Sequence, residues 1–265
     1  MIAIFAASGA AAQDFGNDGP RWYGEFDLGY HWPGKVDSTS TRPAPDGLPY
    51  NWVWRPKSDW AMTAELGYRF TPHLRAELQV GFENSGLASA RVPNANRPGE
   101  PRGLCALASV LPNCIPTGQE NANWSWMLTG GANVIYDVAP SWRLDPFIGA
   151  GVGLAHIEWP TSRFLFSNVP GPISASNPAM QFLRGAGTLN RTGQFDVQFL
   201  GGASYRVTPR IHLVFTYRHY LTPGLLRWNP DNVTRGVDIQ HGLQPGDFTG
   251  RFQDDSATVG LRYGF

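Results

Sequence analysis

The feature that most constrains the fold is a short aromatic motif that recurs four times along the chain. Tyr is followed two residues later by Phe or Val at Tyr68-Arg69-Phe70, Tyr136-Asp137-Val138, Tyr205-Arg206-Val207 and Tyr263-Gly264-Phe265. A small residue and a proline follow the first three copies, at Thr71-Pro72, Ala139-Pro140 and Thr208-Pro209. Such pairs mark tight turns. The motif therefore predicts three short hairpin turns, in repeating units of roughly 65 residues.

Apolar and polar residues alternate with a period of two on both sides of each proline. After Pro72, one face carries Leu74, Ala76, Leu78 and Val80, and the other carries Arg75, Glu77, Gln79 and Gly81. The same alternation of apolar and polar residues is found in seven segments, and an eighth segment begins near Trp22. This period is typical of antiparallel strands whose two faces meet different surroundings. The sequence therefore predicts an all-β protein with eight antiparallel strands.

Alternation alone does not say which face is enclosed, because a secreted ligand carrier such as a lipocalin alternates equally well. The connections near 33–58, 84–122, 158–191 and 221–252 span about 25 to 40 residues, whereas the three turns are very short. Short periplasmic turns and long extracellular loops are typical of bacterial outer-membrane barrels. Loops this long are rare in compact soluble domains. We therefore predict an up-and-down transmembrane barrel and keep the lipocalin-like carrier as the alternative.

Aromatic residues gather at both ends of the predicted strands. The turn end has Tyr68, Phe70, Tyr136, Trp142, Tyr205, Tyr263 and Phe265, and the loop end has Trp32, Trp60, Phe82, Trp124 and Trp126. Tyr and Trp favour the headgroup level of a bilayer, since one part of the ring is apolar and another can form hydrogen bonds. The apolar face is therefore expected to point toward lipid.

The opposite face carries charges of both signs, which we expect to pair inside the barrel. A buried charge is tolerated only when it is paired and hydrogen-bonded. The expected network of ion pairs consists of Glu25, Asp27, Glu65, Arg69, Arg75, Glu77, Asp137, Arg143, Asp145, Asp196, Arg206, Arg218 and Arg262. The alternative is that these are solvated charges on the surface of a soluble sheet.

Two parts of the sequence resemble a known family. The final nine residues, 257–265, resemble the last strand of bacterial outer-membrane barrels, and residues 133–138 and 146–153 look like the fourth and fifth strands of OmpA-like barrel domains. The resemblance covers nearly all of residues 21–265. It implies a bacterial outer membrane location, contact with outer-membrane lipid, and recognition by the barrel-assembly machinery through the terminal Tyr263 and Phe265.

The first twelve residues and the two cysteines carry separate predictions. Residues 1–12 are apolar and end in Ala10-Ala11-Ala12, which predicts the remnant of a secretory signal peptide before a single barrel domain over 13–265. A disordered tail is the alternative. Cys105 and Cys114 lie in a segment rich in Pro, Asn and Gly, and export favours a disulfide over two free thiols.

These features favour a structural or surface-interaction protein. The net charge of zero and the charged fraction of 16% exclude a strongly basic surface for nucleic acid. Eight strands leave an interior that side chains can fill, so we expect a largely sealed polar lumen, with a narrow porin-like channel as the alternative. A lipid-modifying outer-membrane enzyme is the further alternative, and His156 with Glu158 and His219 with Tyr220 are its only candidate groups. Because these residues lie in no catalytic motif, we expect no enzyme, cofactor or metal.

The predicted loops also contain aromatic residues beside arginine, at 50–55 and 225–228. Exposed aromatics beside arginine are typical of recognition sites, which predicts a surface ligand at the long loops. The alternative is that these aromatics pack on one another and order the loops.

Overall fold

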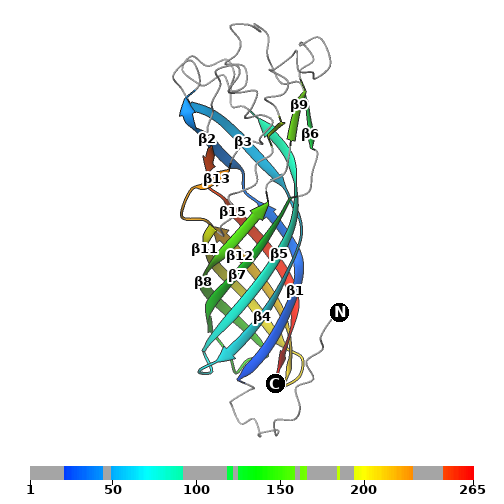
Figure 1. Cartoon of the computed structure of the whole chain (residues 1–265). Helices are drawn as coiled ribbons and strands as arrows, with labels where there is room; N and C mark the ends of the chain where they lie inside the picture. Colours follow the sequence, from blue (N-terminus) through cyan, green and yellow to red (C-terminus); the bar gives the residue numbers. More distant parts are fainter. Residues whose placement is uncertain are drawn as a thin grey trace, which may run out of the picture.

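A computed structural model describes residues 21–43, 49–91, 118–121, 125–158, 162–165, 184–185, 194–228 and 247–265. Eight long antiparallel strands form the barrel (Figure 1): β1 (Trp22–Pro33), β4 (Asp59–Arg69), β5 (Leu74–Arg91), β7 (Ser125–Asp137), β8 (Leu144–Glu158), β11 (Gln194–Arg206), β12 (Ile211–Leu221) and β15 (Gln253–Gly264). Within these residues, no helix is long and apolar enough to cross a membrane. The predicted fold class is confirmed.

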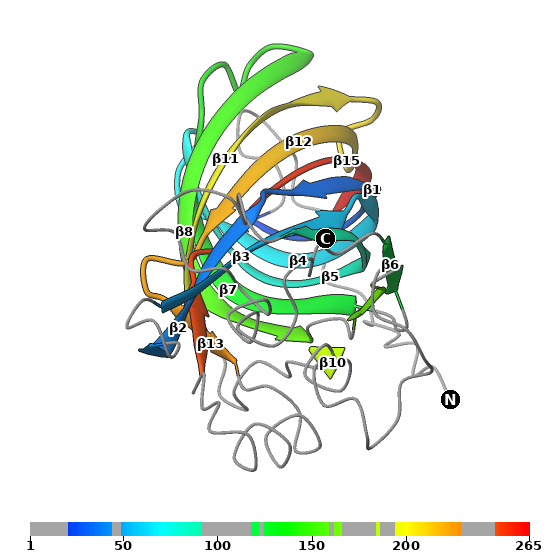
Figure 2. The same cartoon turned by 90° about the horizontal axis from the view of Figure 1, so that it is seen from above.

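The barrel is closed between the first and the last long strand. Each long strand pairs with its neighbours in the chain, and β1 pairs with β15 from Tyr23 opposite Gly264 to Pro33 opposite Asp254. Seen from above, the strands form a continuous ring (Figure 2). Because each of the eight long strands has a partner on both sides, the described barrel wall exposes no row of unpaired backbone groups, as a bilayer core requires.

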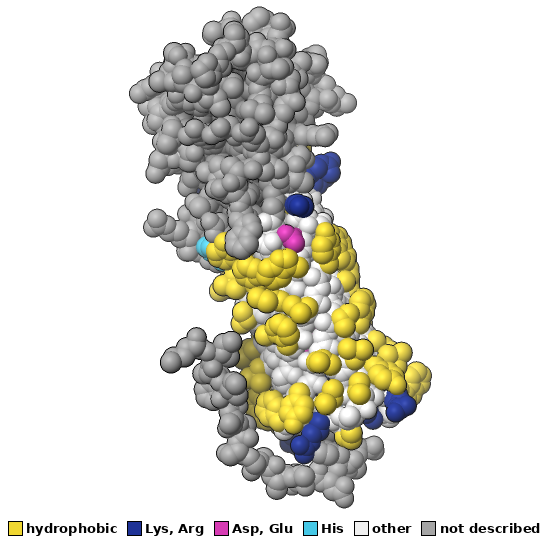
Figure 3. All heavy atoms as spheres, turned by 90° about the vertical axis from the view of Figure 1, so that its right-hand side faces the viewer, with side chains coloured by type: hydrophobic (Ala, Val, Ile, Leu, Met, Phe, Trp, Pro, Cys, Tyr) yellow, Lys and Arg dark blue, Asp and Glu magenta, His cyan; other side chains and the backbone are white. Residues whose placement is uncertain are grey.

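The two faces of the barrel lie as the alternation predicts. Leu78, Val134 and Leu261 are more than half exposed on the outer wall, whereas Glu77 and Arg262 are buried inside. Hydrophobic side chains cover the barrel wall on the face shown in Figure 3, and Lys and Arg side chains lie toward the two ends. The predicted orientation is confirmed, and the lipocalin-like alternative, which requires the apolar face inside, is wrong.

Two aromatic girdles bound this apolar wall. At the turn end the Trp22 ring packs edge to face on Tyr68, with centroids 4.9 Å apart, and at the loop end Trp60 lies 5.4 Å from Phe82. Tyr30 lies eight positions after Trp22 along β1. With a rise of about 3.4 Å per residue and a tilt of about 40°, they span about 21 Å, near the ~25 Å apolar band of such barrels.

Two of the three short turns are closed by the threonine that the motif places there. Thr71 Oγ1 accepts a hydrogen bond from the Leu74 amide, and Thr208 Oγ1 accepts one from the Ile211 amide, each at 3.0 Å. Because proline fixes the backbone at the next position and threonine satisfies an amide, the Thr-Pro pair forms a compact turn.

The long connections contain further strands. These are β2 (Val36–Pro43), β3 (Pro49–Lys57), β6 (Gly118–Asn121), β9 (Ser162–Leu165), β10 (Arg184–Gly185), β13 (Leu226–Trp228) and β14 (Phe248–Gly250). β3 also pairs with the outer part of β5, so the sheet continues past the barrel toward the top of Figure 1. Trp54 in β3 is buried and donates to Ser38 Oγ at 2.8 Å, which agrees with the alternative that loop aromatics pack internally.

Two of the predictions fall outside the described residues. These are the signal peptide remnant at residues 1–12 and the disulfide between Cys105 and Cys114, and both stay predictions.

Candidate functional site

The lumen at the turn end is built around Arg75 of β5, whose side chain is 0% exposed. Its guanidinium forms an ion pair with Glu77 and donates to Asp137 Oδ1 of β7 at 3.1 Å. It also donates to the Tyr23 hydroxyl of β1 at 2.9 Å, and it stacks on the Phe147 ring of β8 at 4.9 Å from the centroid. One arginine thus contacts four strands, which holds the ring of strands together from inside.

Neighbouring side chains extend this cluster across the barrel. The Tyr23 hydroxyl donates to Glu77 at 2.7 Å, and Arg262 of β15 donates to Glu25 of β1 at 2.6 Å. The Arg262 guanidinium also lies over the Tyr23 ring, 4.9 Å from its centroid. Arg69 Nη2 lies 3.6 Å from Asp137 Oδ2. Charge-assisted hydrogen bonds of this kind are stronger than neutral ones.

A second layer crosses the middle of the lumen. Arg218 of β12 pairs with Glu65 of β4 at 3.0 Å, and two strands lie between them in the sheet. Gln79 of β5 donates to the Tyr220 hydroxyl of β12 at 2.7 Å. Asp27 accepts longer contacts of 3.4 Å from Thr63 and Thr258. These contacts run across the cylinder, so they occupy the path that a solute would take.

Apolar side chains also fill part of the interior. Ile135, Phe147, Leu200 and Val214 are buried and form one cluster. Their side chains point into the barrel, on the face of each strand for which the alternation indicated mainly polar residues. The cluster excludes water from one part of the lumen, which strengthens the nearby ion pairs.

Most of the residues predicted for the network lie in the lumen, but some lie outside it or form no ion pair. Ten of the thirteen are buried, and Arg69 and Arg206 are half-buried. Arg143 is exposed, so its predicted place in the lumen is wrong. The reason is that β8 begins only at Leu144, which leaves Arg143 in the turn beyond the end of the cylinder. Arg206 donates to the Pro140 carbonyl at 2.5 Å rather than to a carboxylate.

Two of the predicted acidic residues are buried without an ion pair among the described residues. Asp145 accepts a hydrogen bond from the Ala139 amide at 2.8 Å and so closes a turn. Neither carboxylate oxygen of Asp196 has a hydrogen-bond partner in the described structure. The lumen is therefore richer in carboxylates than the predicted pairing requires.

Glycines on the inward face make room for these large side chains. A Cβ added at Gly67 would lie 2.0 Å from the Tyr23 ring, whereas one added at Gly130, on the lipid face, would have no atom closer than 4.0 Å.

We expect Gly67→Ala to lower the free energy of unfolding by about 1 to 3 kcal/mol, because it displaces Tyr23 from Arg75. Gly130→Ala is the matched control and should be neutral or slightly stabilising. Equal effects in urea titrations of the folded barrel would contradict this role of Gly67.

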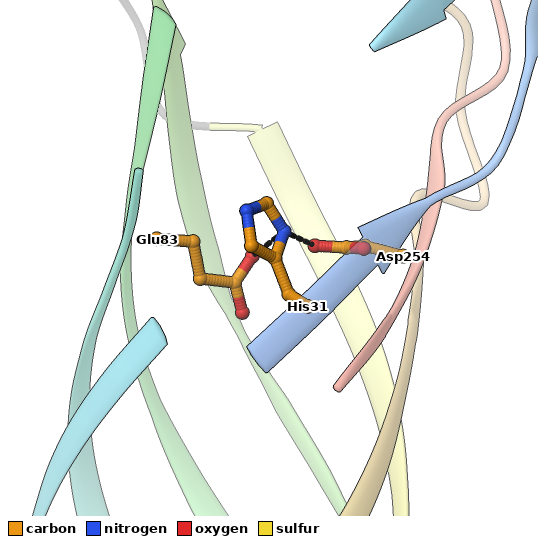
Figure 4. Close-up of side chains that lie close together, drawn as sticks. All are labelled: His31, Glu83 and Asp254. Carbon is orange, nitrogen blue, oxygen red and sulfur yellow. Dashed lines mark hydrogen bonds and ion pairs between the residues drawn. The ribbon is translucent and has the colours of Figure 1, made fainter. Parts of the chain in front are cut away.

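The sequence analysis missed a cluster at the outer end of the lumen. His31 of β1, Glu83 of β5 and Asp254 of β15 are buried, and their side chains point toward one another (Figure 4). His31 Nδ1 lies 2.8 Å from Asp254 Oδ2 and 3.5 Å from Glu83 Oε2. Continuing the inward phase of β5 by one step beyond Gly81 would have identified Glu83, but only the register brings the three together.

The histidines considered for catalysis lie elsewhere. His219 Nδ1 lies 2.7 Å from Asp255, which also accepts a hydrogen bond from the Tyr217 hydroxyl at 2.6 Å, and this pair is partly exposed. The His156 ring packs on Trp126, 5.2 Å between centroids. The terminal aromatics Tyr263 and Phe265 are exposed at the turn end, and the Phe265 amide donates to the Trp22 carbonyl at 3.0 Å.

Comparisons with known proteins agree with this architecture. An uncharacterized protein of Brucella suis biovar 1 (strain 1330) is 23% identical over 92% of this chain and 84% of its own length. One from Brucella melitensis biotype 1 is 24% identical over 76% of the chain and 66% of the relative. The outer membrane protein OprG from Pseudomonas aeruginosa has the same type of fold, with a TM-score of 0.53 at 11% identity, over 93% of this chain and 98% of OprG.

A family model described as an outer membrane protein beta-barrel domain matches residues 1–265. That match covers the closed ring of strands, the apolar outer wall and the polar lumen described above. The chain therefore belongs to the outer membrane protein β-barrel domain family, whose place is the lipid of the bacterial outer membrane.

Proposed function

We propose that this barrel is a structural or surface-interaction protein whose polar lumen is sealed. The observation that carries the proposal is Arg75, which is fully buried and contacts Tyr23, Glu77, Asp137 and Phe147 from one position. An ion moving through this layer would have to break charge-assisted hydrogen bonds in a region of low dielectric. The Arg218 and Glu65 pair adds a second such layer.

We also infer a role outside enzyme catalysis, with recognition through the outer strands. Catalysis by a nucleophile needs a base within hydrogen-bond reach of it. His219 instead contacts Asp255, which also accepts a hydrogen bond from Tyr217. The buried Trp54 supports a folded outer sheet, in which β2 and β3 can present a surface to a ligand. Replacing His156 and His219 together should leave any lipid-modifying activity of the purified protein unchanged; a loss would favour an enzyme.

The C-terminal strand is proposed to be the segment that the barrel-assembly machinery recognises. Tyr263 and Phe265 remain exposed at the turn end after folding, so their rings do not serve the packing of the lumen. Aromatic side chains exposed on an edge or end of a fold are suited to recognition by a partner.

Conductance of the refolded chain in planar bilayers tests the sealed lumen. We expect no discrete conductance steps from the wild-type protein, because two layers of side chains cross the interior. A variant with Arg75→Ser, Arg218→Ser and Tyr220→Ala removes crossing side chains from both layers and should produce steps. Steps of equal size from both proteins would contradict the proposal and support a narrow channel.

A further inference from the structure

The cluster at the outer end of the lumen joins three strands that do not all neighbour one another. His31, Glu83 and Asp254 come from β1, β5 and β15, and β4 lies between β1 and β5. Their side chains are at least 98% buried, and one ligand atom from each lies within 4.8 Å of the other two. Figure 4 shows the imidazole between the two carboxylates.

The hydrogen bond at Nε2 of His31 determines the form of Nδ1, the ring nitrogen that faces the two carboxylates. His31 Nε2 lies within hydrogen-bond distance of the Asn84 carbonyl oxygen, which can only accept, so Nε2 carries a hydrogen. Asn84 is itself held, because its side-chain amide donates to Asp59 at 2.7 Å. A neutral imidazole then directs the lone pair of Nδ1 toward Glu83 and Asp254. Metal-binding histidines are oriented in this way, by a carbonyl that accepts the other N–H.

The charges of this cluster are less well compensated than those of the acidic cluster deeper in the lumen. Glu25, Asp27 and Glu65 also lie within 4.8 Å of one another, but Arg262 and Arg218 pair with two of them. Among the described residues, the ion pairs of Glu83 and Asp254 run only to His31. Apart from a contact between the two carboxylates, Glu83 Oε2 and Asp254 Oδ1 have no hydrogen-bond partner there.

A proton on Nδ1 would compensate only one of the two carboxylates. The second would have to take up a proton of its own, which Glu83 and Asp254 could share in a hydrogen bond, or remain a buried charge that is costly in a low-dielectric interior. A divalent cation at the same point would compensate both and would use the Nδ1 lone pair as well.

The three groups lie beside a small cavity. It has a volume of about 20 Å³ and borders His31, Glu83 and Asp254 together with Trp126 and Phe252, and its free surface is apolar. The cavity therefore gives these side chains room to adjust around an ion, and the ligand atoms themselves supply the polar site. Tetrahedral coordination with bonds of about 2.0 to 2.2 Å places neighbouring ligand atoms about 3.3 to 3.6 Å apart. The distance of 3.5 Å from Nδ1 to Glu83 Oε2 lies within that spacing. The distance of 2.8 Å from Nδ1 to Asp254 Oδ2 is shorter, so the Asp254 carboxylate would have to move back by about 0.5 Å to admit an ion.

We propose that His31 Nδ1, Glu83 Oε2 and Asp254 Oδ2 bind one divalent transition-metal ion of the Zn²⁺ type. One imidazole with two carboxylates suits first-row ions such as Zn²⁺ better than Mg²⁺ or Ca²⁺, which prefer oxygen ligands alone. Three protein ligands leave the fourth position for water. The bound ion joins β5 to the closing pair of strands, β1 and β15, at the outer end of the lumen.

Titration of the refolded full chain with Zn²⁺, in competition with a chromogenic chelator, tests this site. We expect one high-affinity ion per chain and a loss of affinity of about 100-fold or more in His31→Gln, since removing a ligand should exceed the effect of removing its supporting group. His219→Gln is the matched control, because His219 also contacts an aspartate at 2.7 Å but lies in a partly exposed pair. It should keep the wild-type affinity.

Thermal unfolding supplies an independent readout. Zn²⁺ should raise the Tm of the wild type and of His219→Gln, but not of His31→Gln, because a ligand stabilises only the state that binds it. If His31→Gln does not fold, Asp254→Asn serves as the second variant, since the amide has nearly the same shape as the carboxylate. X-ray absorption of the Zn²⁺-loaded wild type should show one imidazole in a shell of nitrogen and oxygen ligands.

Three results would overturn the proposal. The first is the absence of stoichiometric Zn²⁺ uptake by the folded wild type. The second is unchanged affinity in His31→Gln or Asp254→Asn, which would indicate binding at other histidines. The third is a zinc shell without imidazole.

Discussion

Replacing Arg75 by methionine is expected to lower the free energy of unfolding of the barrel by about 3 to 5 kcal/mol. Methionine keeps most of the side-chain volume but removes the charge that compensates Glu77 and Asp137. Both carboxylates would stay buried, at 5% and 1% exposure, without their shared partner. The Tyr23 hydroxyl would also lose a donor. The large effect thus arises from uncompensated charge and only slightly from lost packing.

Urea titration of the chain folded in phosphatidylcholine vesicles measures this change. Arg143→Met is the matched control, because Arg143 is an exposed arginine at the same end of the barrel, and it should change stability by no more than about 0.5 kcal/mol. Adding Glu77→Gln and Asp137→Asn to Arg75→Met should recover part of the loss. A small effect of Arg75→Met alone would show that its ion pairs do not hold the lumen together.

Placing arginine at Leu78 on the outer wall is expected to lower the free energy of unfolding by about 2 to 4 kcal/mol. Leu78 lies opposite Leu66 and Ala132 on the neighbouring strands, halfway between Leu74 and Phe82, and is 64% exposed on the apolar wall. A guanidinium at this depth would have to enter the hydrocarbon core or bend toward a headgroup.

The matched control for this change is Val138→Arg. Val138 is also exposed, but it lies just beyond the end of β7 at the turn end, where the cost of arginine falls to about 0 to 1 kcal/mol. The same titration in vesicles compares the two variants. Equal, small effects at both positions would mean that the wall at Leu78 does not lie at the centre of a bilayer.

Much of the barrel could be predicted from the sequence because the signals are local. Alternation assigns Leu78 and Glu77 to opposite faces whatever the rest of the chain does, since side chains of a strand point to alternate sides. The Thr-Pro pairs mark the turns because their effect acts within four residues. The candidate site was only partly predictable, because the inward phase identifies residues such as Arg75 and Arg218 but not their partners.

The tertiary structure decided which of the inward residues meet. Arg218 and Glu65 are 153 residues apart, and His31 and Asp254 are 223 apart, so no local pattern relates them. Their contacts depend on the register between strands and on closure of the ring, which also leaves Arg143 beyond the lumen. The sequence by itself thus determined the strands and their turns, because these follow from the period of a single strand and from local turn residues. It also determined the side that faces lipid, because the long loops and the aromatic residues at the strand ends indicate a membrane barrel. Only the closed barrel brought His31, Glu83 and Asp254 together, because depth inside a cylinder is set by how all eight strands are staggered.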